Sequence, residues 1–316
     1  MTERNPPTPR EPLALVGVGC RFPGGVRDTD SLWQLLVDGR SAIREVPDDR
    51  WHVDRYHHRD ADTIGHMVTR RGGFVDQLKQ FDPAFWGISP REAIRMDPQQ
   101  RWLLETAWEA CEDAGIAPST LRGTSVGVFV GAASHDYGTL QLDDLANLDV
   151  HSNTGGTLSI AANRISYMFD FKGPSLAVDT ACSSALVAVA IACRAIWSGE
   201  CDAALAGGVN ALITPNTSVG FSKASMLSPS GECYAFDARA NGYVRGEGAG
   251  LVLLKPLSNA IQQRDRIYAV LRSAVVNQDG QTSSMTVPSV AGQSEMLAAA
   301  YREAGVAPQD VAYMEA

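Results

Sequence analysis

Short apolar runs alternate with longer amphipathic segments along most of the chain. The runs carry no polar face, which is typical of strands buried on both sides of a sheet. The longer segments place apolar residues three and four positions apart, which is typical of helices that cover such a sheet. We expect strands at residues 13–18, 126–130, 176–179, 203–209, 251–254, 267–276 and 311–314, and helices at 31–37, 157–169, 183–197 and 293–304. This alternation predicts an α/β protein with a largely parallel sheet.

A further helix is indicated by its end signals. Asp97 and Pro98 suit an N-cap and a first helical position, and Gly115 suits the C-terminal end. The helix at 183–197 has a different character, because it is apolar on almost every side. We therefore expect it to be deeply buried.

The helix that ends near Gly115 and the strand after it have a second copy near the end of the chain. Residues 107–131 and 299–316 both give a helix, a glycine, an Ala-Pro pair and a strand. This repeat indicates a duplicated fold whose second lobe begins near residue 266. Because reactive groups gather beyond the carboxyl ends of strands in such folds, the chain ends where functional residues are expected to begin.

Composition narrows the classes of function. Hydrophobic residues make up 45% of the 316 residues and charged residues 20%, as in globular proteins with a core. The formal net charge of −9 argues against nucleic acid or an anionic membrane as the main partner. Residues 1–11 form a polar, proline-rich arm without the apolar core of a signal peptide. The longest apolar run, 185–193, is shorter than the roughly 20 residues of a membrane helix, so a cytoplasmic protein is expected.

The six cysteines form no Cys-x-x-Cys pair, so neither a zinc site nor a disulfide framework is predicted. Cys20, Cys111, Cys193 and Cys201 lie in apolar patterns and are interpreted as small buried hydrophobes.

Cys182 differs from the other cysteines, because it lies between a buried strand and a buried helix in VDTACSSALVAV. A strand-to-helix turn can project a side chain into a crevice. The start of a helix favours thiolate over thiol, and nearby backbone N–H groups can hold a developing oxyanion. These properties predict a nucleophile.

No proton partner for Cys182 stands out in the sequence. His135 and His151 are candidates, but nothing local supports either. His57 and His58 lie near acidic residues at a spacing that matches no structural metal site, so no metal is predicted. The glycines of VGVGCRFPGG begin like a dinucleotide-binding motif, but Phe22 stands where the third glycine is required.

Several motifs in order resemble the ketosynthase (β-ketoacyl-acyl carrier protein synthase) domain of a modular type I polyketide synthase. The resemblance runs from about Pro12 to Ala316. The matching segments are VGVGCRFPGG (16–25), FDPAFWGISPREAIRMDPQQRWLLETAWEACEDAG (81–115), SNTGGTLSIAANRISYMFDFKGPS (152–175), VDTACSSALVAV (178–189), FDARANGYVRGEGAG (236–250) and VNQDG (276–280).

The resemblance implies a thiolase-like α/β fold, with duplicated halves in five layers and an incomplete second half. Residues 12–265 would form the N-terminal lobe, and residues 266–316 the start of the C-terminal lobe. The resemblance also implies a homodimer, commonly paired through the strand before the nucleophile.

The same resemblance assigns roles to three residues. Cys182 would take an acyl group from the phosphopantetheine thioester of an acyl carrier protein, with its own backbone N–H as one oxyanion donor. Phe221 and Tyr243 match positions near the acyl pocket of the family. A malonyl-type extender would then lose CO2 and attack the acyl-cysteine. No cofactor would be bound by the domain itself, and the other domains of the synthase would be its partners.

The resemblance also sets a limit. In the family, two histidines that drive decarboxylation follow the segment that ends here at Ala316, so we expect these 316 residues not to catalyse condensation. Two alternatives remain open. One is a thioesterase or acyltransferase that uses His135 or His151. The other is a non-catalytic protein that binds carrier protein or dimerises with a complete ketosynthase.

Overall fold

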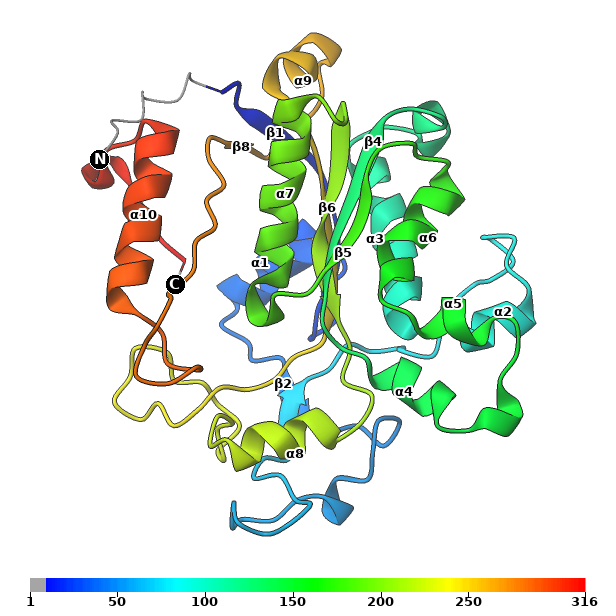
Figure 1. Ribbon diagram of the computed structural model, residues 1–316, viewed down its shortest axis with the longest axis vertical. Helices are drawn as coiled ribbons and strands as arrows, with labels where there is room; N and C mark the ends of the chain where they lie inside the picture. The colour runs from blue at the N-terminus through cyan, green and yellow to red at the C-terminus, as the bar shows by residue number, and fades with distance from the viewer. Residues whose placement is uncertain (1–9, 316) are drawn as a thin grey trace.

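A six-stranded mixed sheet forms the centre of the molecule, with its strands in the order β5-β4-β6-β7-β1-β8 (Figure 1). The computed structural model describes residues 10–315. The strands are β1 (Leu13–Arg21), β4 (Val126–Ala132), β5 (Ser175–Val178), β6 (Ala203–Asn210), β7 (Gly248–Pro256) and β8 (Ala269–Leu271). A small antiparallel pair, β2 (Ile43–Glu45) and β3 (Arg71–Gly73), lies apart from them.

The prediction of a largely parallel sheet is wrong for three of the five strand pairings. β4 pairs in parallel with β5 and β6, whereas β7 is antiparallel to both β6 and β1, and β8 is antiparallel to β1. The apolar runs indicate burial on both faces, and a central antiparallel strand is buried in the same way. One consequence is that Gly248, at the start of β7, lies opposite Asn210, at the end of β6.

Helices cover both faces of the sheet. α3 (Pro98–Asp113) and α6 (Ser159–Phe169) pack on one face, and α7 (Ser184–Ser198) packs on the other (Figure 1). Along β4 the side chains alternate between the two layers: Val128 and Val130 face α3 and α6, and Phe129 faces α7. The remaining helices are α1 (Thr29–Val37), α2 (Pro90–Arg95), α4 (Asp136–Leu142), α5 (Ser152–Gly156), α8 (Asn216–Lys223), α9 (Leu257–Gln263) and α10 (Val290–Ala304).

Glycines let these helices approach the sheet closely. A Cβ atom on Gly17 would lie 2.0 Å from the carbonyl oxygen of Ala110 in α3. On the other face, a Cβ atom on Gly131 would lie 2.4 Å from the backbone nitrogen of Ala185, at the start of α7. The glycines that begin like a dinucleotide-binding motif therefore serve helix packing.

The internal repeat is visible in the local structure. After α3, the amide of Ile116 donates to the carbonyl of Cys111, and after α10 the amide of Val306 donates to the carbonyl of Tyr301. Each helix is followed by a glycine with positive φ and then by a 3-10 turn, Pro118–Leu121 or Pro308–Asp310. The copies differ after the turn: the first continues into β4, whereas the strand predicted at 311–314 is not formed.

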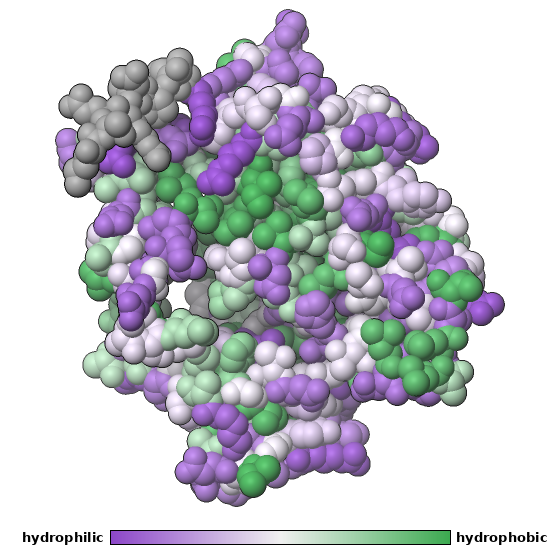
Figure 2. Space-filling view, in the orientation of Figure 1, coloured by the Kyte–Doolittle hydropathy of each residue, from purple (hydrophilic) through white to green (hydrophobic). Residues whose placement is uncertain are grey.

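α7 is less buried than its composition predicted. Ala188, Ala192 and Cys193 are buried against the sheet, but Leu186 on the opposite side is 77% exposed. Apolar side chains gather on this face of the molecule (Figure 2). One helix in the described part of the chain, Ala181–Ser198, is long and apolar enough to cross a membrane. This is weak evidence for a membrane-spanning segment, because the core helices of globular proteins have the same length and composition.

A buried carboxylate joins the loops at the edge of the sheet where β4 and β6 end. The Glu247 side chain is fully buried and forms an ion pair with Arg50, with 2.7 Å between Oε2 and Nη2. It also accepts hydrogen bonds from the amides of Val75 and Leu212, each at 3.0 Å. We call these four residues the Glu247 clamp.

We expect Glu247→Gln to lower the free energy of unfolding by about 1.5–3 kcal/mol, because it removes the buried counter-charge of the Arg50 guanidinium and leaves only the half-exposed Asp49, 2.9 Å away. Urea denaturation would measure this. As a control, Asp237→Asn breaks the exposed Asp237–Arg239 pair and should cost less than about 1 kcal/mol. Equal stability of Glu247→Gln and the unchanged chain would contradict the role of the clamp.

We expect Gly131→Ala to destabilise the fold by about 1–3 kcal/mol, because the new methyl group collides with the backbone of α7. Thermal unfolding would measure the loss. Gly220→Ala is the matched control: Gly220 lies inside α8 with open space around its Cβ position, so the change should be neutral or stabilising by up to about 1 kcal/mol. Similar effects of the two substitutions would rule out the packing explanation.

Candidate active site

Cys182 lies in a strained turn between β5 and α7. The chain leaves β5 at Val178, passes through the 3-10 turn Ala181–Ser183 and enters α7 at Ser184. Ala181 has φ of 55°, in the left-handed region that non-glycine residues rarely adopt. A backbone conformation of this kind persists only where the surrounding structure enforces it. The strained residue, Ala181, immediately precedes the cysteine.

Polar side chains of the same motif hold this turn in place. Asp179 Oδ1 accepts a hydrogen bond from the Ala181 amide at 2.9 Å. Ser184 Oγ accepts from the Thr180 amide at 2.8 Å and donates to the Ala181 carbonyl at 2.6 Å. Cys182 remains exposed, and its amide donates to no acceptor within residues 10–315. The amide is therefore free to serve as an oxyanion donor.

Cys182 opens into a cavity of about 760 Å³ at the edge of the sheet where β4, β5 and β6 end and β7 begins. The lining residues include Cys182, Phe22, Leu140, Thr214, Asn216, Thr217, Phe221 and the segments 131–136, 208–210 and 243–249. The cavity therefore lies at the carboxyl ends of the parallel strands, where open α/β sheets usually bind ligands.

Phe221 and Tyr243, the two pocket residues expected from the resemblance, line the same cavity as Cys182. Their rings meet edge to face, with centroids 6.0 Å apart and an interplanar angle of 66°. Burial raises the pKa of the Tyr243 hydroxyl, Arg245 opposes this, and the nearby Cys182 adds to it.

The structure separates the two candidate histidines. His135 lines the cavity, at the residue before α4, whereas His151 is not among the lining residues and precedes α5. Neither forms a hydrogen bond with Cys182 within residues 10–315. Of the two, only His135 is placed to act on a group bound in the cavity.

Exposure sets Cys182 apart from most of the other cysteines. Burial raises the pKa of four thiols, to about 11 for Cys20, Cys193 and Cys201 and to about 12 for Cys111. Those thiols are therefore poor nucleophiles at neutral pH. Cys182 and Cys233 are both exposed.

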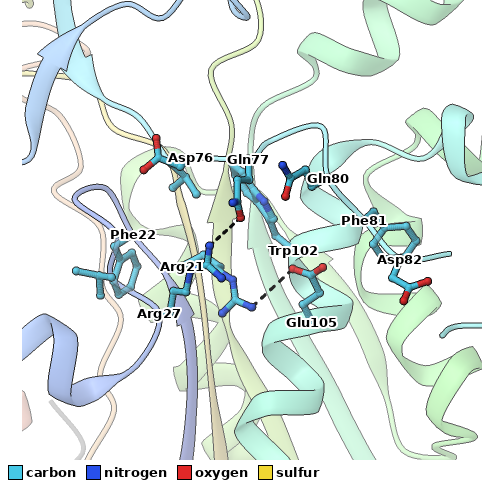
Figure 3. A pocket seen from close by; sticks show the side chains of 13 residues that line it. Arg21, Phe22, Arg27, Asp76, Gln77, Gln80, Phe81, Asp82, Trp102 and Glu105 are labelled. Carbon is cyan, nitrogen blue, oxygen red and sulfur yellow. Dashed lines mark hydrogen bonds and ion pairs between the residues drawn. The ribbon is translucent and has the colours of Figure 1, made fainter. Parts of the chain in front are cut away.

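A second cavity, of about 410 Å³, shares one lining residue, Phe22, with the Cys182 cavity. Both of its arginines contact another lining residue (Figure 3): Arg27 donates to Gln77 at 2.7 Å, and Arg21 lies 3.7 Å from Glu105. It holds no cysteine or histidine. Within residues 10–315 no three His, Cys, Asp or Glu side chains are grouped as a metal site.

The sequence did not reveal Arg245, Thr214 or Glu247 as residues of this region. Arg245 and Thr214 line the Cys182 cavity, and the Glu247 clamp holds the segment that carries Arg245. Two signals were available for Arg245 and Glu247: they are a pair of charged residues inside a run of glycine and apolar residues, and they lie in the matching segment 236–250.

Comparisons with known proteins agree with the resemblance seen in the sequence. Residues 10–260 match the family described as beta-ketoacyl synthase, N-terminal domain, and residues 268–316 match its C-terminal domain. One phenolphthiocerol/phthiocerol polyketide synthase protein of Mycobacterium tuberculosis is 50% identical over 306 residues, which are 97% of this chain and 20% of that protein. A second protein of the same synthase is 48% identical over 96% of this chain and 17% of its own length.

Solved structures give the same result. An oxazolomycin ketosynthase domain of Streptomyces albus JA3453 superposes with a TM-score of 0.91 at 38% identity, covering 96% of this chain and 54% of that one. The module 6 ketosynthase of the bacillaene synthase of Bacillus subtilis 168 gives a TM-score of 0.89 at 39% identity, covering 96% and 51%.

The chain spans about a fifth of the length of its curated relatives and about half of the solved ketosynthase chains. With the fold, the order of the motifs and the placement of Cys182, these matches show that the chain belongs to the beta-ketoacyl synthase family, with the thiolase-like fold of polyketide synthase ketosynthase domains.

Proposed function

We propose that the chain is part of a β-ketoacyl synthase of polyketide biosynthesis and that Cys182 is its acyl-accepting nucleophile. The observation that carries this proposal is an exposed thiol on a strained strand-to-helix turn, facing a cavity of about 760 Å³. The ketosynthase relatives support the same chemistry.

In the proposed step the Cys182 thiolate attacks the carbonyl carbon of an acyl thioester. A bond forms between Sγ and that carbon, and the carbonyl oxygen becomes an oxyanion that the Cys182 amide can bind. When the intermediate collapses, the bond to the original sulfur breaks, and the released thiolate takes a proton from solvent. The acyl group then remains on Cys182. Among the residues described, this transfer is the step that the geometry supports.

We propose that condensation follows this transfer in the whole synthase. An extender of malonyl type would lose CO2 and attack the acyl-cysteine. The resemblance assigns that step to two histidines that are not among these 316 residues.

The proposed function also implies partners for this chain. The phosphopantetheine that carries the substrates would belong to an acyl carrier protein, with no cofactor bound by this domain. The other synthase domains, a homodimeric arrangement and a cytoplasmic location follow from the same assignment. We also propose two lobes, 12–265 and 266–316, which the separate family matches at 10–260 and 268–316 support.

A thioesterase that uses His135 is the second candidate, because His135 lines the Cys182 cavity. In that case the acyl-cysteine would be hydrolysed rather than held. The two functions differ in whether acyl-Cys182 accumulates.

We expect the chain to gain one acyl group on Cys182 when it is incubated with the butyryl thioester of N-acetylcysteamine. Intact mass spectrometry and peptide mapping would show the modification. Cys182→Ala should abolish it, whereas Cys233→Ala, which removes the other exposed thiol, should leave it in place.

Acylation that persists in Cys182→Ala, or that depends on Cys233, would contradict the assignment. Continuous hydrolysis of the thioester that requires both Cys182 and His135 would favour the thioesterase.

A further inference from the structure

The end of the Cys182 cavity that lies against α8 is rich in hydrogen-bond donors. Thr214, Asn216 and Thr217 line the cavity there, and α8 begins at Asn216. Pro215 precedes the helix, and no side chain caps its first turn. The amides of a first helical turn have no partner inside the helix and favour a negative charge.

Arg245 brings a positive charge to the same place. Its Nη1 donates to Ser218 Oγ, in the first turn of α8, at 3.1 Å, and its guanidinium lies 5.5 Å from the centre of the Phe221 ring. Within residues 10–315 no carboxylate lies within 4.0 Å of the guanidinium. Burial lowers the pKa of Arg245, which shows the cost of holding this cation away from water without a close counter-ion.

Two carboxylates act on Arg245 from farther away, and both are already engaged. Asp136 Oδ2 accepts hydrogen bonds from the amides of Ile213 and Thr214, at 3.0 and 2.8 Å. Glu247 is paired with Arg50. Both offset part of the positive charge of Arg245, but neither fills its hydrogen-bonding capacity.

The Thr214 hydroxyl indicates independently that a hydrogen-bonding ligand binds at this end of the cavity. The residue is only 9% exposed, and its Oγ1 has no hydrogen-bond partner although it belongs to a cavity-lining side chain. Buried hydroxyls are nearly always hydrogen-bonded in native proteins. An unpaired buried hydroxyl, an uncapped helix start and an unpaired guanidinium thus meet at one end of one cavity.

The geometry points to a binding subsite for an anionic group, a carboxylate or a phosphate, at this end of the cavity, formed by Arg245, Thr214 and the first turn of α8. This inference rests on the proposed function, because the anion would be part of the thioester that acylates Cys182. A group with several anionic oxygens could accept from all three sets of donors at once.

The subsite is connected to Cys182 through the aromatic pair. Tyr243 lines the same cavity as Cys182 and packs edge to face on Phe221, and the Arg245 guanidinium lies over the Phe221 ring. An acyl group held along Phe221 and Tyr243 could therefore bring a terminal carboxylate to Arg245. The phosphate of a pantetheine arm is the other source of the same chemistry.

Four thioester probes distinguish these sources. One pair is the butyryl and the 4-carboxybutyryl thioester of N-acetylcysteamine, and the other is the butyryl thioester of pantetheine and of 4′-phosphopantetheine. The rate of Cys182 acylation is measured for each probe by mass spectrometry. We expect the charged member of one pair to react about tenfold or more faster than its neutral partner, because charge-assisted hydrogen bonds contribute about 1.5–3 kcal/mol.

The readout in each variant is the ratio of charged to neutral rates. Arg245→Met should bring the ratio close to one, Arg245→Lys should restore part of it, and Thr214→Val should lower it by roughly three- to tenfold. The matched control is Arg239→Met, because Arg239 is an exposed arginine that pairs with Asp237 and should leave the ratio unchanged.

Loss of the preference for the carboxylate supports an acyl-group subsite, and loss of the preference for the phosphate supports a subsite for the carrier arm. Equal ratios in the unchanged chain and in Arg245→Met would overturn the inference.

A direct binding measurement separates this inference from the proposed function. Glutarate and inorganic phosphate are titrated against the unchanged chain and against Arg245→Met by calorimetry. Binding that requires Arg245 supports the subsite even if no probe acylates Cys182. Absence of binding by both anions would overturn the subsite even if acylation of Cys182 occurs.

Discussion

A single buried carboxylate holds together the loops on which the active-site cavity depends. Glu247 receives two hydrogen bonds from Arg50 and one each from the amides of Val75 and Leu212, so three segments far apart in the sequence meet at one side chain. In a buried setting each of these bonds strengthens the others, and none has water to replace it. The segment that holds Tyr243 and Arg245 continues directly into Glu247, so their positions follow from the clamp.

The turn that presents Cys182 shows how packing overcomes local preference. Ala181 adopts a left-handed conformation that its own side chain disfavours. The Ala181 amide donates to the Asp179 carboxylate, and the Ser184 hydroxyl donates to the Ala181 carbonyl, which holds this conformation in place. Gly131 lets the start of α7 approach the sheet. Asp179, Ser184 and Gly131 are therefore needed at these positions because they stabilise the turn that presents Cys182.

Much of this arrangement could be predicted from the sequence, because it depends on local patterns. Strands β1, β4, β5, β6 and β7, the helix from Pro98 and the turn at Cys182 all follow from apolar spacing and end signals. The short strands β2 and β3 were not predicted, and β8 covers only three residues of the strand expected at 267–276. Strand direction could not be predicted, since the antiparallel strand β7 is as apolar as the parallel strands β4 and β6. The strand expected at 311–314 carried the apolar pattern, but in the described chain it has no partner strand to form a ladder.

Some residues of the candidate site could likewise be predicted from the sequence, and others could not. Cys182 can be identified from its local context, whereas Phe221 and Tyr243 come from the resemblance alone. Arg245 and Thr214 escape sequence analysis, because their importance lies in what they lack: a close counter-ion for one and a hydrogen-bond partner for the other. A missing counter-ion or hydrogen-bond partner can be recognised only in the folded structure, where segments distant in sequence lie side by side.

The pairing of β1 with β7 has a consequence for how the protein is made. Residues 13–21 emerge from the ribosome well before residues 249–256, which are their central neighbour in the sheet. At roughly 5–20 residues per second, β1 waits on the order of ten to fifty seconds for this partner. During that interval an apolar strand has both edges open, so this part of the nascent chain is exposed to aggregation and to chaperones.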